Sequence, residues 1–167
     1  FTEPTRAWFT GAFEAPTPAQ LGAWDAISSG RHALVIAPTG SGKTLSSFLW
    51  ALDSFVREPA TEGTAATRVL YVSPLKALGV DVERNLRAPL VGITQTAAHQ
   101  GRPVPRVRVG VRSGDTPAAE RRRLQQDPPD ILITTPESLY LMLTSQARAA
   151  LTGVRTVILD EVHALAG

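Results

Sequence analysis

The sequence predicts an α/β domain with a mostly parallel β-sheet and helices on both faces. Five short apolar runs indicate strands, at 33–37, 68–73, 106–111, 130–135 and 156–160. Helical patterns lie between most of these runs, and a helix is the usual crossover between parallel strands. Near-continuous apolar strands also indicate a sheet that is buried on both sides, so helices must cover both faces.

Two of the expected helices have clear apolar spacing. The helix after the first strand has Leu45, Phe48, Leu49, Leu52 and Phe55 at helical intervals. The helix after the fourth strand is indicated by Leu139, Leu141, Met142 and Leu143. The run 106–111 alternates arginine with valine, so one side of this strand faces water and we place it at or near a sheet edge.

Length and composition indicate one compact globular domain. The chain has 167 residues, of which 43% are hydrophobic and 19% charged. No apolar run approaches the roughly 20 residues of a membrane span, and cysteine is absent, so we expect a cytoplasmic protein without a membrane partner. Among 17 basic residues only Lys43 and Lys76 are lysines, and both fall inside motifs.

A glycine-rich loop joins the first strand to its helix. From Ala37 to Thr44 it reads "APTGSGKT", which matches the phosphate-binding pattern G-x-x-x-x-G-K-[ST] except that Ala37 replaces the first glycine. Gly40 and Gly42 allow backbone N–H groups to face a phosphate. Lys43 would reach the outer phosphates, and the Thr44 hydroxyl would bind Mg²⁺. The loop therefore predicts a nucleoside triphosphate site.

An acidic pair and a glutamine complete the expected nucleotide site. Asp160 ends the apolar run of "TVILDEVH" and could hold Mg²⁺ through water, while Glu161 could orient and deprotonate an attacking water. The pair favours hydrolysis over transfer to a substrate; alone, it could simply cap a strand. No guanine-type N-K-x-D stretch occurs, and the Gln20 amide could read adenine or could be a solvated surface group.

Ser-Pro or Thr-Pro pairs precede four helical stretches, at 17–18, 73–74, 116–117 and 135–136. The hydroxyl can cap a helix and proline suits its first position. Two of the pairs, at 73–74 and 135–136, follow strand ends directly, so their helix N-termini would point over the carboxyl edge of the sheet. They are either caps only or phosphate sites.

The motifs "PTPAQ", "APTGSGKT", "SPLKAL", "TTPES" and "DEVH", in this order, resemble the first RecA-like domain of a superfamily 2 helicase. Longer stretches, among them "LYVSPLKALGVDVERNL" and "PDILITTPESLYLMLTS", resemble the Lhr (large helicase-related) family of ATP-dependent DNA helicases. The resemblance covers nearly the whole chain. It implies that residues 1–167 form an N-terminal RecA-like P-loop NTPase domain, truncated after the DEVH motif and lacking the second RecA-like domain.

The resemblance also implies residue roles. ATP-binding positions would be Gln20, Thr39, Gly40, Ser41, Gly42, Lys43, Thr44, Asp160 and Glu161. Lys43 and Glu161 would be catalytic, and Thr44 and Asp160 would bind the metal. Nucleic-acid phosphates would contact Ser73, Pro74, Lys76, Arg112, Ser113, Gly114, Thr135 and Pro136. Glu137 and Ser138 replace the Gly-Arg of DEAD-box RNA helicases, which disfavours that group as the nearest relative.

The implied activity is that of an ATP- and Mg²⁺-dependent motor. The full-length protein would move along single-stranded DNA and unwind DNA or RNA:DNA duplexes in DNA repair, and the isolated domain would hydrolyse ATP poorly. Two alternatives remain: a nucleic-acid clamp without strand separation, and a restriction or remodelling translocase. Seven arginines between 102 and 123 form either a nucleic-acid footprint or a solvated face; we expect function only for Arg112.

Overall fold

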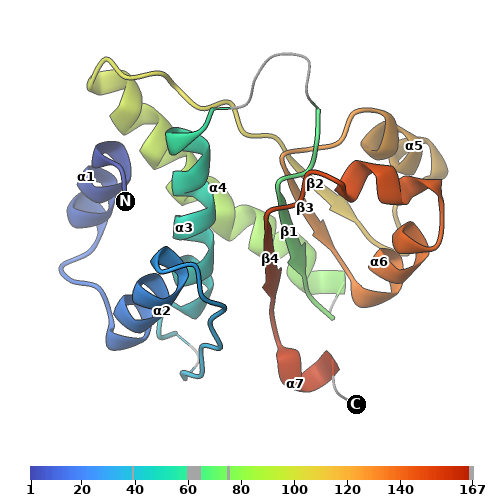
Figure 1. The fold of residues 1–167 in the computed structure, drawn as a ribbon, viewed down its shortest axis with the longest axis horizontal. Coiled ribbons are helices and arrows are strands. Elements are labelled where there is room, and N and C mark those ends of the chain that lie inside the picture. The colour runs from blue at the N-terminus through green and yellow to red at the C-terminus, as the bar shows by residue number, and fades with distance from the viewer. Residues whose placement is uncertain (39, 60–64, 75, 166–167) are drawn as a thin grey trace. The chain divides into compact units, whose positions relative to one another are not determined.

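The computed structural model describes residues 1–38, 40–59, 65–74 and 76–165. The chain divides into two compact units, residues 1–59 with 86–105 and residues 60–85 with 106–167. Each unit has its own elements (Figure 1). Within the described part of the chain, no helix is both long and apolar enough to cross a membrane.

The first unit is helical. It contains α1 (Glu3–Ala12), α2 (Pro18–Ser28), α3 (Lys43–Arg57) and the later part of α4 (Lys76–His99), which begins in the second unit. The spacing predicted for α3 is confirmed, because Phe48, Leu49, Leu52 and Phe55 are all buried. The Trp24 indole N–H donates to the Ser46 carbonyl oxygen at 2.9 Å and ties α2 to α3.

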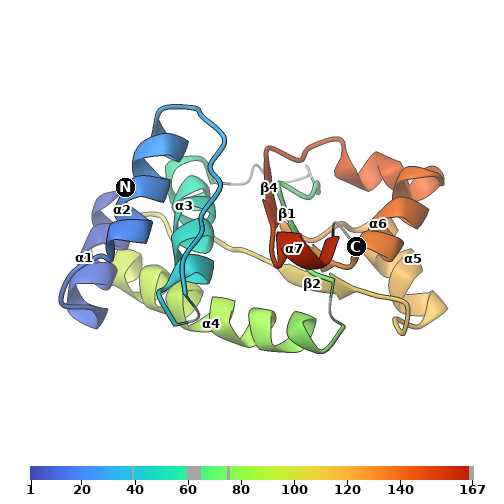
Figure 2. The ribbon, with the colours of Figure 1, turned by 90° about the horizontal axis from the view of Figure 1, so that it is seen from below.

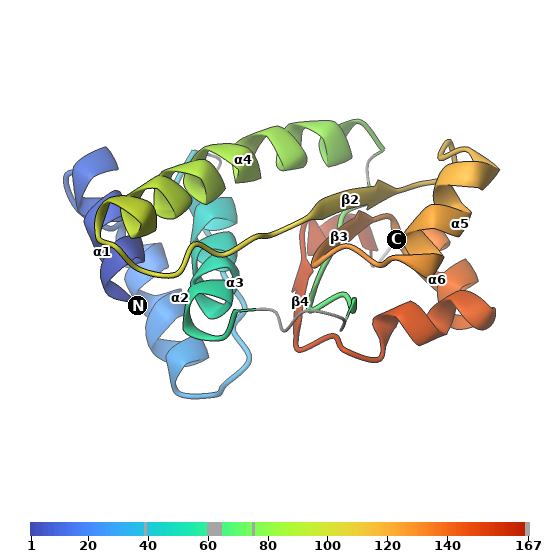
Figure 3. The same cartoon turned by 90° about the horizontal axis from the view of Figure 1, so that it is seen from above.

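The second unit contains the sheet. Its elements are β1 (Val69–Val72), β2 (Val109–Arg112), α5 (Ala118–Gln126), β3 (Ile131–Thr134), α6 (Pro136–Leu143), the 3₁₀ helix η1 (Gln146–Leu151), β4 (Thr156–Leu159) and α7 (Val162–Leu165). All strand pairs are parallel, in the order β2-β3-β1-β4 (Figures 2 and 3). β2 is an edge strand, as its arginine–valine alternation predicted.

The two inner strands are buried along their whole length, as expected for a parallel sheet covered on both faces. On one face Leu70, Val72 and Leu132 pack with Met142 of α6 and Ala147 of η1. The alternate residues point the other way and are also buried: Val69, Tyr71, Ile131 and Ile133. The predicted α/β fold with a parallel sheet is therefore confirmed.

One strand prediction and one burial prediction are wrong. Residues 33–37 form no strand, and Leu34 and Ile36 are 76% and 86% exposed. A strand needs a neighbour for its backbone hydrogen bonds, and this run pairs with none among the described residues. The run 156–160 was predicted to be buried, but β4 is an edge strand and its Val157 and Leu159 are about half exposed.

Candidate nucleotide and nucleic-acid site

The phosphate loop has the backbone that its glycines predict. Gly40 and Gly42 have φ values of +82° and +78°, a region that favours glycine, and α3 begins immediately afterwards at Lys43. Gly42 has a second requirement, because a Cβ atom there would lie 2.4 Å from the Gln20 side-chain nitrogen. The predicted Thr39 contact lies outside the described residues.

Lys43 is directed back across its own loop. Its ammonium nitrogen donates to the carbonyl oxygen of Ala37 at 2.5 Å. A phosphate bound in the loop would therefore compete with this carbonyl for the ammonium group. The Thr44 side chain, in the first turn of α3, is half-buried and belongs to the same unit.

Gln20 is buried and tied to the phosphate loop, so it is not a solvated surface group. Its side-chain oxygen accepts from the Thr17 backbone N–H at 2.9 Å, and its backbone N–H donates to the Thr17 hydroxyl at 3.3 Å. Its side-chain nitrogen donates to the Gly42 carbonyl at 3.4 Å, and the Thr17 hydroxyl donates to the Ser41 carbonyl at 3.1 Å. The start of α2 and the loop thus form one hydrogen-bonded group.

Asp160 follows β4 in the second unit, and its backbone N–H and both carboxylate oxygens are hydrogen-bonded. Its backbone N–H donates to the Val72 carbonyl at 2.9 Å, and one carboxylate oxygen accepts from the Glu161 N–H at 2.9 Å. The other carboxylate oxygen accepts from the Tyr71 hydroxyl. Burial, followed by this hydrogen bond, raises the pKa of Tyr71 well above its ordinary value, so Tyr71 stays a donor.

Sequence reasoning missed Tyr71. The available signal was a phenol in an otherwise aliphatic strand, since a buried tyrosine hydroxyl needs a polar partner.

Glu161 has an unusual backbone. It is the only non-glycine residue in the described ranges with positive φ, at +52°. Such a conformation costs about 1–3 kcal/mol and is often found at functional sites. The Glu161 carboxylate lies 3.2 Å from the His163 imidazole nitrogen. The turn after β4 therefore presents two adjacent carboxylates on a constrained backbone.

The predicted helix caps are partly confirmed. Thr17 caps α2, and Thr135 caps α6 by accepting from the Ser138 N–H at 3.3 Å. The prediction for Thr116 is wrong, because its hydroxyl accepts from the Ser113 N–H at 2.9 Å and α5 begins without a side-chain cap. The Thr116 hydroxyl is used instead by the tight turn that precedes α5, where it accepts from the Ser113 N–H.

Several buried polar atoms in the described part of the chain have no hydrogen-bond partner. Three of them are the hydroxyl oxygens of Ser41 and Ser73 and one terminal nitrogen of Arg112, and others belong to residues outside the predicted site, such as Asp53 and Arg121. Buried polar atoms are normally paired, so each such atom needs a reason. All three belong to residues predicted to contact nucleotide or nucleic acid, where a ligand oxygen or N–H would be the partner.

Positive charge is concentrated at the turn between β2 and α5. Burial, and then the charge of Arg121, lower the pKa of Arg112. Arg121 itself donates to the Gly114 carbonyl at 2.8 Å, and the uncapped N-terminus of α5 lies on the same turn. Two guanidinium groups repel each other here, and each has one buried nitrogen without a hydrogen-bond partner. An anion would stabilise such a pair.

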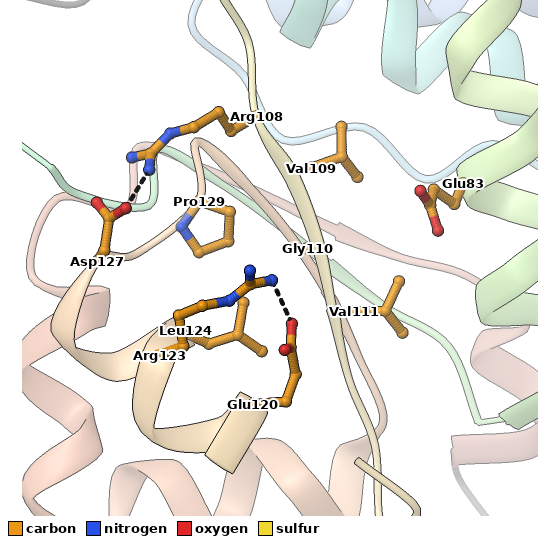
Figure 4. Close-up of a pocket in the computed structure, with 10 residues that line it drawn as sticks. All are labelled: Glu83, Arg108, Val109, Gly110, Val111, Glu120, Arg123, Leu124, Asp127 and Pro129. Atoms are coloured by element: carbon orange, nitrogen blue, oxygen red, sulfur yellow. Dashed lines mark hydrogen bonds and ion pairs between the residues drawn. The ribbon is translucent and has the colours of Figure 1, made fainter. Parts of the chain in front are cut away.

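A separate cavity of about 560 Å³ lies between β2 and α5 (Figure 4). Four of its charged side chains form two ion pairs: Arg108 lies 2.6 Å from Asp127, and Arg123 lies 2.7 Å from Glu120. None of the predicted site residues that the structure describes lines it. The two arginines are thus paired with acidic neighbours, in agreement with a solvated face for this part of the arginine stripe.

The structure groups the predicted residues as follows. Gln20, Ser41, Gly42 and Lys43 lie together in the first unit, where Gly40 and Thr44 also belong. In the second unit Asp160 contacts Glu161. The nucleic-acid candidates of the second unit lie at or after the ends of three neighbouring strands. They are Ser73 and Pro74 after β1, Arg112 at the end of β2 with Ser113 and Gly114 after it, and Thr135 and Pro136 after β3. Lys76 begins α4, and its side chain is outside the described part.

Comparison with known proteins gives close matches. The chain is 66% identical over 99% of its length to the Lhr helicase/probable uracil glycosylase of Mycolicibacterium smegmatis, and 56% identical over 100% to the Lhr helicase/uracil glycosylase of Escherichia coli. It spans 11% of the length of each of these proteins. A solved structure of M. smegmatis helicase Lhr bound to ssDNA and AMP-PNP matches 99% of this chain and 21% of that chain, with 64% identity and a TM-score of 0.93.

More distant helicases share the fold. The yeast DEAD-box splicing factor Prp28 matches with a TM-score of 0.78 at 21% identity, over 99% of this chain and 38% of that chain. These matches confirm the predicted RecA-like architecture. The family model described as DEAD/DEAH box helicase covers residues 17–167, which is most of the sequence. On that coverage, the chain belongs to the DEAD/DEAH box helicase family.

Proposed function

We propose that this chain is the ATP-binding domain of a helicase that moves along single-stranded DNA and unwinds DNA or RNA:DNA duplexes. The observation that carries the proposal is the match, at 64% identity over 99% of the chain, to a helicase solved with ssDNA and AMP-PNP. The buried, unpartnered atoms of Ser41, Ser73 and Arg112 support it independently, because each is a donor that a phosphate oxygen would satisfy.

On the nucleotide side, Lys43 exchanges the Ala37 carbonyl for the outer phosphates of ATP. Gly40, Ser41 and Gly42 supply backbone N–H groups, Thr39 flanks them, and Gln20 reads adenine. The Thr44 hydroxyl and the Asp160 carboxylate are hard oxygen ligands that suit Mg²⁺. Bound Mg²⁺ would neutralise charge that develops on the phosphates.

Glu161 orients the attacking water and accepts its proton. Glu161 follows Asp160 directly on a backbone with φ of +52°, and its N–H donates to the Asp160 carboxylate at 2.9 Å, which supports a shared role for the pair. Hydrolysis then changes the grip of the domain on nucleic acid.

On the nucleic-acid side, the turns after β1, β2 and β3 contact the sugar–phosphate backbone. The contacts come from Ser73, Pro74, Lys76, Arg112, Ser113, Gly114, Thr135 and Pro136. Such contacts hold a strand without reading its bases, as a motor that moves along any sequence requires. Their position after neighbouring parallel strands supports one continuous track.

A second RecA-like domain of the full-length protein completes the motor. It supplies the remaining charge-stabilising groups, so the isolated 167 residues should hydrolyse ATP poorly. We place the activity in the cytoplasm and in DNA repair.

Replacing Lys43 by alanine in the full-length protein tests the proposal. The Lys43→Ala variant should lose ATP-driven strand displacement and largely retain single-strand binding, because the lysine is assigned to the nucleotide phosphates and not to the nucleic-acid track. Arg31→Ala is the matched control, since Arg31 is an exposed cation of the same unit, paired with Asp25 at 3.1 Å. Unchanged displacement by Lys43→Ala contradicts the proposal, and ATP hydrolysis without displacement in the parent protein favours a clamp.

A further inference from the structure

Tyr71 makes an unusual contact for a core residue of the sheet. It lies on β1 and is 1% exposed, and its hydroxyl donates to a carboxylate oxygen of Asp160. The contact follows from strand register: Tyr71 is paired with Ile158 on β4, and Asp160 is two residues further along the same face. Both residues belong to the second unit.

The Asp160 carboxylate is held from two sides. The oxygen that does not accept from Tyr71 accepts from the Glu161 N–H at 2.9 Å, and the Asp160 N–H is bonded to Val72 at 2.9 Å. A carboxylate oxygen has two lone pairs, so each oxygen keeps one for a metal ion or a metal-bound water. Removing the Tyr71 hydroxyl would leave the carboxylate held from one side only, by the Glu161 N–H, so it could turn more easily about its last bond.

We propose that Tyr71 is a positioning residue, whose hydroxyl aims the Asp160 carboxylate at the Mg²⁺ of the bound nucleotide. The inference rests on the proposed ATP site and adds to it a residue that acts only through Asp160. A phenylalanine would fill the same space in the sheet. The Tyr71→Phe change therefore removes the hydroxyl without changing the packing of the ring. The group that accepts from this hydroxyl, the Asp160 carboxylate, is the carboxylate assigned to the metal.

The test is metal binding by the full-length protein, with Mn²⁺ as the probe. In the presence of AMP-PNP, Tyr71→Phe should weaken Mn²⁺ binding, measured by electron paramagnetic resonance, roughly tenfold or more, as is typical for partners of metal ligands. AMP-PNP affinity in EDTA should not change, because Tyr71 contacts no nucleotide. Tyr140→Phe is the matched control: Tyr140 is 67% exposed on α6 and should behave as the parent protein.

A second background shows whether Tyr71 acts through Asp160. In an Asp160→Ala protein, adding Tyr71→Phe should cause no further loss of Mn²⁺ affinity. A further loss there, or parent-like Mn²⁺ binding by Tyr71→Phe alone, overturns the inference. So does loss of cooperative thermal melting in Tyr71→Phe, because the hydroxyl would then serve folding.

The proposed function fails by a different result. A parent protein that binds no Mn²⁺ with AMP-PNP and hydrolyses no ATP contradicts the nucleotide site itself, whatever Tyr71→Phe does. A parent that binds and hydrolyses normally, with Tyr71→Phe indistinguishable from it, removes only the role of Tyr71.

Discussion

Gln20 uses both ends of its side-chain amide inside the protein. The oxygen caps α2 through Thr17, and the nitrogen reaches the Gly42 carbonyl at 3.4 Å, a long and therefore weak hydrogen bond. The nitrogen is the end that can be given up to an adenine ring. In the proposed site, base selection and loop geometry would thus depend on the same side chain.

Gln20→Glu separates these two uses, because glutamate keeps the capping acceptor and loses the donor. We expect the preference for ATP over GTP to fall roughly threefold to tenfold, the value of one hydrogen bond. Titration with fluorescent ATP and GTP analogues measures this preference. Gln95→Glu, an exposed change on α4, is the control. Equal affinity of the parent protein for both analogues would remove the adenine role.

Among the elements, α6 depends on a cap that α5 lacks. Thr135→Ala should weaken α6 by about 1 kcal/mol, because the Ser138 N–H loses its acceptor. Thr135→Ser keeps the oxygen and should cost much less. Hydrogen exchange of the full-length protein checks this, with faster exchange in residues 136–143 of the alanine variant only. Equal exchange in the two variants would show that the hydroxyl contributes nothing to α6.

The accuracy with which the sequence predicts each strand depends on which partners its backbone hydrogen bonds find. β1, β3 and β4 were predicted to within one residue at each end, because the apolar pattern of each agrees with its pairing in the sheet. β2 begins three residues late, since the Arg108 N–H bonds the Asp130 carboxylate at 2.7 Å. Residues 33–37 have the apolar pattern of a strand but pair with no strand among the described residues. The apolar pattern alone does not predict whether a partner strand is present.

The backbone of the candidate phosphate loop was predictable for a different reason. A phosphate loop needs glycines at positive φ, and Gly40 and Gly42 satisfy that requirement locally. Tyr71 could not be assigned from sequence, because its contact with Asp160 joins residues 89 positions apart and depends on the pairing of β1 with β4. A sequence motif predicts the chemistry of residues that are close in sequence. Contacts between residues on different strands can be predicted only when the register of strand pairing is known.

At the scale of the whole chain, the proposed nucleic-acid binding must come from local charge. The net charge is only +2, too small for a strong general attraction to DNA. Arg112→Ala should therefore weaken single-strand binding at every sequence and reduce the slope of log affinity against log salt by about one. Arg122→Ala, an exposed arginine on α5, should change neither quantity much. Identical salt slopes for the two variants would exclude Arg112 from the strand-binding track.

β1 carries Tyr71, and Ser73 follows directly after its last residue, Val72. Two steps along a strand span only ~7 Å of nearly inextensible backbone. A displacement of the Asp160 carboxylate, passed to Tyr71, would thus reach the proposed DNA contact at Ser73 with its size unchanged. In the proposed motor, β1 would transmit a displacement along its length without amplifying it. The movement that advances the protein by a nucleotide must then come from rotation of whole domains.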